Sequence, residues 1–212
     1  MTDHKTAREL LVSAIRPALK ALGKDDRAHE ELLLGSALQE SEGLATRVQG
    51  RGGPALSYFQ MEPFTHDDIW KTYLEYHPAL KESVTKLMSD PKADKIHELQ
   101  YNDKYAAAMA CIKYLRCDEP VPKAGDIKAQ AEYWKDHYNS PDGAGKPSQY
   151  IEHWKRFKGD DAFQAPPVAQ TDRPTNKPED PKPKHPDISI EDPDDPLGDK
   201  KKQRHARGER PQ

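Results

Sequence analysis

The stretch Ala28-His-Glu-Glu-Leu-Leu-Leu-Gly-Ser-Ala-Leu-Gln-Glu-Ser-Glu42 decides how this sequence folds. Its leucines and alanines recur at three- and four-residue steps and cover most sides of a helix. A helix that is apolar nearly all round is a buried helix, so we expect it at the centre of the fold. Residues 43–62 then break the helical pattern with four glycines and a proline, which predicts a loop with room for a small hairpin.

Amphipathic segments lie on both sides of this central helix in the sequence. A first helix is expected from about residue 6 to residue 22, where Gly23 ends it. Thr65 and Asp68 form a capping signal for a helix that continues to residue 74. Further helices are expected over residues 78–88, 103–117, 126–138 and 148–157. No internal repeat and no alternating strand pattern competes, so the predicted fold class is mainly α.

The composition separates a folded part from a tail. Of the 212 residues, 34% are hydrophobic and 33% are charged, and ten of the 19 prolines follow Gly159. A segment of that kind cannot bury enough apolar surface to offset the entropy lost on ordering. We therefore expect a folded domain over residues 1–159 and a disordered, proline-rich tail over 160–212. Within the tail an acidic block at 187–199 precedes a basic block at 200–210.

Charge and residue spacing exclude several classes of protein. The formal net charge of -3 argues against a main role in coating nucleic acid or an anionic membrane, and the basic cluster at 200–210 predicts only a weak DNA contact. No run reaches the ~18 apolar residues of a membrane span, and the first residues lack the apolar stretch of a signal peptide. Cys111 and Cys117 lie too far apart on one expected helix to form a disulfide. The spacing of histidines and cysteines predicts no metal site, and no motif predicts a cofactor.

Glu40 is the residue that the local pattern singles out for chemistry. On the expected central helix it shares a face with Leu33, Ser36 and Ala37, so its stem leaves an apolar environment. Burial and the helix C-terminus both disfavour a carboxylate, which raises the pKa and suits the group to general acid catalysis. The alternative is an ordinary exposed acid at a helix end.

Three short motifs around Glu40 resemble those of the lytic transglycosylases. In family order the matching residues are Glu40-Ser41, then Phe59-Gln60 with Pro63 and Thr65, and last His137-Tyr138-Asn139 with Gly143 and Gly145. The resemblance covers residues 28–157 and is closest to the virion-associated peptidoglycan hydrolases of tailed bacteriophages. Two departures stand out: Ser57 occupies a position where the family usually has glycine, and Ser140-Pro141-Asp142 lengthen the third motif.

The resemblance implies a lysozyme-like fold of the goose-type or soluble lytic transglycosylase kind. It also implies cleavage of the β-1,4 bond between N-acetylmuramic acid and N-acetylglucosamine, with Glu40 as the acid. One acid suffices in this family, because the muramic 6-hydroxyl attacks internally and the same glutamate takes its proton. A hydrolase needs a second carboxylate about 5–9.5 Å away, for which Glu62, Asp67 and Asp68 are candidates. Glu42, about 200° round the helix from Glu40, is expected to point elsewhere.

The resemblance further implies a set of supporting residues, which are Ser41, Tyr58, Phe59, Gln60, Tyr138 and Asn139. Tyr138 is expected to place its hydroxyl beside the Glu40 carboxyl, unless it is simply a core residue, and Asn139 to anchor the loop that follows. Gln60 suits an N-acetyl group or a sugar hydroxyl, and Ser41 tethers the helix end by hydrogen bonding. Tyr58, Phe59 and Met61 either form an apolar wall beneath a sugar or plug the core.

Partners and place of action are implied in the same way. The substrate would be peptidoglycan glycan strands, and residues 160–212 would bind other virion proteins of the tail or the ejection apparatus. The protein would be made in the host cytoplasm, travel in the virion, and open the host cell wall from the periplasm for genome delivery. Two alternatives remain: an endolysin released at lysis, and a non-enzymatic structural or ejection protein that retains the fold.

Overall fold

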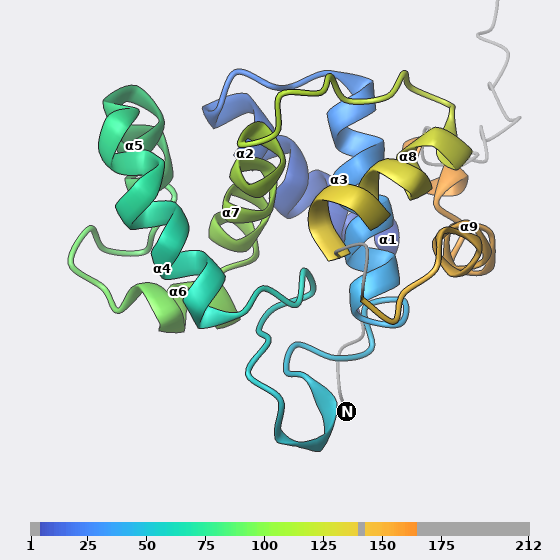
Figure 1. The fold of residues 1–212 in the computed structure, drawn as a ribbon, viewed down its shortest axis with the longest axis horizontal. Coiled ribbons are helices and arrows are strands. Elements are labelled where there is room, and N and C mark those ends of the chain that lie inside the picture. The colour runs from blue at the N-terminus through green and yellow to red at the C-terminus, as the bar shows by residue number, and fades with distance from the viewer. Residues whose placement is uncertain (1–4, 140–142, 165–212) are drawn as a thin grey trace, which may run out of the picture. The chain divides into compact units, whose positions relative to one another are not determined.

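Helix α3 (Arg27–Glu40) lies at the centre of the larger group of helices (Figure 1). The computed structural model describes residues 5–139 and 143–164, and these ranges are mainly helical, with two isolated β-bridges in place of strands. Around α3 pack α1 (Ala7–Leu10), α2 (Arg16–Ala21), α7 (Asp103–Leu115), α8 (Ile127–Trp134) and α9 (Pro147–Arg156). Eight consecutive α3 residues from Glu31 to Leu38 are buried, which confirms the prediction of a central helix.

The remaining described helices lie on one side of α7 or at the joints between the longer elements. They are α4 (Pro63–Thr72), α5 (Pro78–Thr85), α6 (Lys95–Tyr101), the π-helical turns η1 (Leu11–Ile15) and η4 (Lys135–Asn139), and the 3₁₀ turns η2 (Gly50–Gly52), η3 (Leu74–Tyr76) and η5 (Asp160–Phe163). Helix α6 was not expected, although Asp94 caps it by accepting hydrogen bonds from two backbone amides. Helix α4 begins at Pro63 and not at a Thr65 cap, because proline suits the first helical position.

The first expected helix is one continuous helical segment, but its hydrogen-bonding pattern changes along its length. It widens into the π-helical turn η1 just before α2, whose second residue is Pro17. Proline has no amide hydrogen to donate, and its ring clashes with the carbonyl four residues earlier, so a regular helix cannot pass through it. The wider turn accommodates Pro17 and leaves Leu11, Ala14 and Ile15 facing the core.

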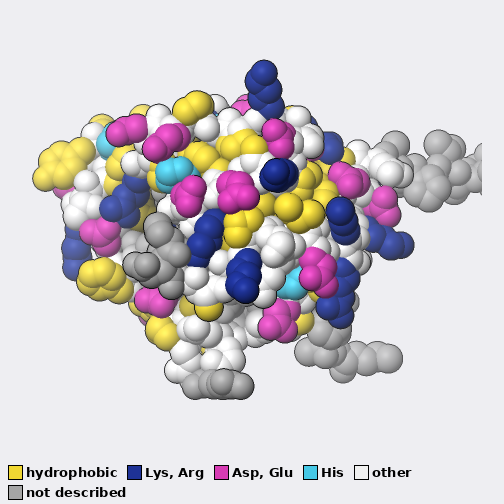
Figure 2. All heavy atoms as spheres, turned by 45° about the vertical axis from the view of Figure 1, so that its right-hand side comes forward, with side chains coloured by type: hydrophobic (Ala, Val, Ile, Leu, Met, Phe, Trp, Pro, Cys, Tyr) yellow, Lys and Arg dark blue, Asp and Glu magenta, His cyan; other side chains and the backbone are white. Residues whose placement is uncertain are grey.

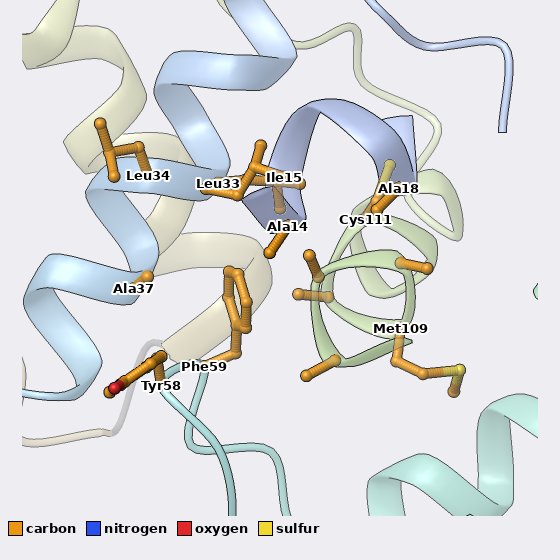
Figure 3. Close-up of a cluster of buried hydrophobic side chains, with 14 of the residues drawn as sticks. Ala14, Ile15, Ala18, Leu33, Leu34, Ala37, Tyr58, Phe59, Met109 and Cys111 are labelled. Atoms are coloured by element: carbon orange, nitrogen blue, oxygen red, sulfur yellow. The ribbon is translucent and has the colours of Figure 1, made fainter. Parts of the chain in front are cut away.

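The core lies between η1, α3 and α7, where small side chains alternate with large ones (Figure 3). The alanines of α7 and the leucines of α3 are all buried in this core, and Gly35 of α3 leaves space for Tyr150 of α9. A Cβ built on Gly35 would stand 1.9 Å from the Tyr150 hydroxyl oxygen. The close approach of α3 and α9 therefore depends on a glycine at this position.

The folded chain extends beyond the boundary that we expected at residue 159. Ala162 in η5 is buried, and Phe163 packs against the core with the Arg27 guanidinium 3.2 Å from its ring centroid. Contacts of Phe163 with Arg27 and Trp154, and of Arg8 with the Ala162 carbonyl, hold this segment, which the composition had assigned to the tail. The acidic and basic blocks, and the DNA contact expected at 200–210, lie outside the described residues.

Charges of both signs share the surface of the described residues. On the face drawn in Figure 2, lysine and arginine side chains are interspersed with aspartate and glutamate. Ion pairs such as Lys81–Glu75 and Lys86–Glu82 connect neighbouring exposed groups. Within ranges 5–139 and 143–164, every helix is too short or too polar to cross a membrane.

Candidate active site

A polar cleft opens at the C-terminal end of α3. Its volume is about 520 Å³, and its walls come from the end of α3, the loop of residues 41–62, the start of α4, the C-terminal part of α7 and the turn η4. The lining residues are Glu40, Glu42, Thr46, Gln49, Gly50, Ala55, Gln60, Glu62, Thr65, Lys113, Tyr138 and Asn139. Residues from all three motifs of the sequence analysis therefore meet in one cleft.

Glu40 is the last residue of α3, and its carboxyl leaves the core at the floor of this cleft. Burial raises the pKa of Glu40 to about 7, against the opposing effects of a hydrogen bond from Trp134 and the positive charge of Lys113. At neutral pH the protonated and ionised forms are therefore both populated. A group in this state is able to donate a proton and to accept one within a single reaction cycle.

Trp134 is a site residue that the sequence analysis missed. Its indole Nε1 donates a hydrogen bond of 2.8 Å to Oε1 of Glu40, and its ring is 1% exposed at the end of α8. Gly145 lies against the same ring, because a Cβ at that position would stand 2.5 Å from it. The sequence could have indicated Trp134, because it stands four residues before Tyr138 of the third motif. This spacing puts both side chains on one face of a helix.

Lys113 is the second site residue that was missed. Its Nζ donates to the backbone carbonyl of Tyr138 at 2.5 Å and lies 3.8 Å from the centroid of the Tyr138 ring. Burial lowers the pKa of Lys113, while the nearby carboxylates of Glu40 and Glu62 act in the opposite direction. The sequence could have indicated Lys113, because it is a single lysine within the apolar stretch of α7.

Tyr138 lines the cleft, but its hydroxyl has a different partner from the one expected. The hydroxyl donates to the backbone carbonyl of Phe59 at 2.8 Å, and the hydrogen bond to Glu40 comes from Trp134 instead. Tyr138 is 3% exposed, and burial raises its pKa well above the ordinary value. It therefore fixes η4 to the loop that precedes α4, in keeping with the interfacial alternative.

Asn139 lies at the end of η4, where Lys135 binds both it and the chain beyond. The Lys135 Nζ donates to Oδ1 of Asn139 at 3.2 Å and to the carbonyl of Gly143 at 2.7 Å. This ammonium spans residues 139 and 143, on either side of the insertion in the third motif. Asn139 thus takes part in anchoring the loop while it lines the cleft.

The two aromatic residues of the loop before α4 are buried away from the cleft. Phe59 is 1% exposed and points between η1, α3 and α7, and Tyr58 is 5% exposed beside the end of α3 (Figure 3). The Arg47 guanidinium covers the Tyr58 ring at 4.1 Å. An apolar wall beneath a sugar is therefore the wrong assignment for this pair, and the alternative of plugging the core is the observed one. The reason is that their burial completes the core under α3.

Three polar residues hold the same loop in place. Ser41 is fully buried, donates to the carbonyl of Ala37 at 2.6 Å and accepts from the amide of Leu44 at 2.9 Å, so it tethers the end of α3 without reaching the cleft. Ser57, where the resemblance led us to expect glycine, has a φ of 65°, a left-handed conformation that glycine adopts without strain. Gln60 does line the cleft, although its Nε2 donates to the Ser57 carbonyl at 2.7 Å.

Of the three candidates for a second acid, the structure places one in the cleft and two outside it. Glu62 lines the cleft, whereas Asp67 binds Nδ1 of His66 at 3.0 Å and Asp68 pairs with Arg116 at 2.8 Å. Neither aspartate lies among the cleft residues, because both belong to α4 beyond its first turn.

Glu42 does line the cleft, against expectation. Helix α3 ends at Glu40, and Glu42 has a φ of 52°, so a helical angle no longer predicts its direction.

The described residues form a mainly helical fold with an acid-lined cleft, in which burial raises the pKa of Glu40 to about 7. Among the described residues, no three histidine, cysteine, aspartate or glutamate side chains are grouped to hold a metal ion. No protein-family model, curated protein or solved structure matches the chain.

Proposed function

We propose that this protein is a virion-associated peptidoglycan-degrading enzyme of the lytic transglycosylase type with a lysozyme-like fold. It cleaves the β-1,4 bond between N-acetylmuramic acid and N-acetylglucosamine with Glu40 as its acid. The observation that carries the proposal is the placement of Glu40, which ends a buried helix at the floor of a polar cleft with a pKa of about 7.

The reaction uses one carboxyl in two steps. Protonated Glu40 donates its proton to the glycosidic oxygen, and the bond from that oxygen to the muramic C1 breaks as positive charge builds on the sugar. The muramic 6-hydroxyl oxygen then bonds to C1, and its proton passes to the Glu40 carboxylate. The acid is restored, and the product carries a 1,6-anhydro-muramic end.

The polar lining of the cleft suits a sugar substrate. Gln60, Thr65 and Asn139 bring amide and hydroxyl groups to the walls, which can bind N-acetyl groups and sugar hydroxyls. Several of these groups come from segments far apart in the chain, held by Tyr138 and Lys135. A rigid arrangement of this kind supports substrate orientation.

The carboxylates of Glu42 and Glu62 keep a hydrolytic reaction as the second candidate. Both line the cleft with Glu40, and either is a possible base for an attacking water. The mass of the products separates the two reactions, because hydrolysis leaves a reducing end and transglycosylation leaves an anhydro end. We expect anhydro ends, and we expect Glu42→Gln and Glu62→Gln to retain them.

Replacement of Glu40 by Gln tests the enzymatic assignment. We expect muropeptide release from purified peptidoglycan to fall by at least about a hundredfold, since the proton donor is lost. Glu82→Gln, the same change at an exposed position on α5, is the matched control and should release muropeptides at the wild-type rate. Undiminished release by the Glu40 variant removes this residue from the mechanism, and an inactive wild type favours the non-enzymatic scaffold.

The place of action needs a separate measurement. Mass spectrometry of purified virions should detect the protein if it travels in the particle to act on the host wall at infection. Detection only in the lysate supports the endolysin alternative. We propose tail or ejection proteins as its partners through residues 160–212, and a virion pull-down with the full chain tests that contact.

A further inference from the structure

We propose that Lys113 is a positioning residue for Glu40: it holds the turn η4 against the cleft and supplies the cation that faces Glu40 once this residue has given up its proton. The inference rests on the proposed function for its catalytic consequence, but the contact itself is testable without activity. Lys113 lies on α7, and Glu40 and η4 lie on separate elements, so one side chain couples three parts of the site.

The geometry of Lys113 is unusual for a lysine. Its Nζ is turned inward, donates to the Tyr138 carbonyl at 2.5 Å and stands 3.8 Å from the Tyr138 ring centroid. The carbonyl and the face of the ring both stabilise a cation. An ammonium has three N–H donors, and the described contacts use one of them on a backbone carbonyl, which leaves donors for the cleft.

The polar and charged groups near the Glu40 carboxyl come from several elements. Glu42 follows α3 and Glu62 precedes α4, so two acids face the cleft along with Glu40. Trp134 of α8 contributes a neutral donor. Of the described residues that line the cleft, Lys113 is the one cation. It therefore offsets a cleft that is otherwise acidic.

This arrangement has a consequence for the reaction cycle. In the first step Glu40 becomes a carboxylate in a partly buried site next to two other acids, which is costly without a compensating charge. Lys113 stabilises that carboxylate and so makes proton donation easier. The ammonium also fixes the backbone of Tyr138, whose hydroxyl donates to the Phe59 carbonyl in the loop before α4. Different substitutions of Lys113 remove its charge or its hydrogen bond to the Tyr138 carbonyl, so the two effects can be measured separately.

The test compares Lys113→Met, which keeps the stem and removes the charge, with Lys113→Arg, which keeps the charge. The direct readout is the titration of the Glu40 carboxyl carbon by NMR in the full-length protein. We expect the midpoint to rise by about one pH unit in Lys113→Met and to stay near the wild-type value in Lys113→Arg. The pH profile of muropeptide release should move upward in the same order.

The outcomes separate this inference from the proposed function. If the Glu40 midpoint in a folded Lys113→Met variant coincides with that of the wild type, the inference is overturned whatever the activity. If the midpoint rises but the wild type releases no muropeptides, the electrostatic coupling stands and the proposed function fails. Should Lys113→Met not fold, Lys113→Gln provides the same neutral position with a donor for the Tyr138 carbonyl, and the same rise in midpoint is expected.

Discussion

The indole Nε1 of Trp134 donates a 2.8 Å hydrogen bond to Oε1 of Glu40 and joins the end of α8 to the end of α3. The two residues are 94 positions apart in the chain. A donor to the charged form lowers the pKa of a carboxyl, while burial raises the pKa, and for Glu40 burial is the larger effect. These two opposing contributions place the pKa of Glu40 at about 7.

Replacement of Trp134 by Phe should raise the pKa of Glu40 further above its ordinary value. The ring would stay in the core while the Nε1 donor is lost, so burial would act with less opposition. NMR titration of the Glu40 carboxyl measures the change. Trp70→Phe, which removes an indole donor to Tyr105 at a distant site, is the matched control. An equal midpoint in the Trp134 and Trp70 variants contradicts this account.

Replacement of Glu40 by Gln should change how stability depends on pH. The folded-state pKa of about 7 lies above the ordinary value of 4.5, so the folded state binds more protons than the unfolded state between these pH values. Stability from this group is present below pH 4.5 and is lost as pH rises towards 7, a fall of about 3 kcal/mol. Urea unfolding at pH 4.5 and pH 8 should show that Glu40→Gln lacks this fall. If the unfolding free energies of variant and wild type change equally between the two pH values, the raised pKa of Glu40 is ruled out.

Replacing Ser57 by Gly and by Ala measures the energetic cost of the backbone conformation at this position. Ser57→Gly and Ser57→Ala both remove the hydroxyl that accepts from the Phe59 amide, but only alanine keeps a Cβ at a φ of 65°. We expect Ser57→Gly to be more stable than Ser57→Ala by about 1 kcal/mol in urea unfolding. The same pair at Ser36, inside α3, should show the opposite order, because glycine weakens a helix interior. One order at both positions would contradict the prediction.

Replacement of Gly35 by Ala should disturb the contact between α3 and α9. The added methyl group would overlap the Tyr150 hydroxyl and force α9 outward, at a cost of about 2–3 kcal/mol. Thermal unfolding with circular dichroism measures the loss. Gly50→Ala is the control, because nothing lies within 4 Å of a Cβ there. If the two variants melt together, α9 does not depend on the glycine.

The helical fold could be predicted in outline because helix periodicity is a local property. The apolar face of α3 is visible in its own leucines, and most of the other helices were placed within a few residues. The failures have local physical causes. Helix α6 is short and follows a polar turn, Pro17 widens η1, and Phe163 buries a segment whose composition resembled the tail.

By itself the sequence determined that an apolar helix ends in Glu40 and is followed by a glycine-containing loop, so a buried acid with a raised pKa was within reach of local reasoning. Only the tertiary structure decided what surrounds that acid. Trp134 and Lys113 come from α8 and α7, and Glu42 enters the cleft because the helix ends before it. The physical reason is that periodicity tells which face of a helix is buried, whereas the partner across an interface depends on how the helices pack.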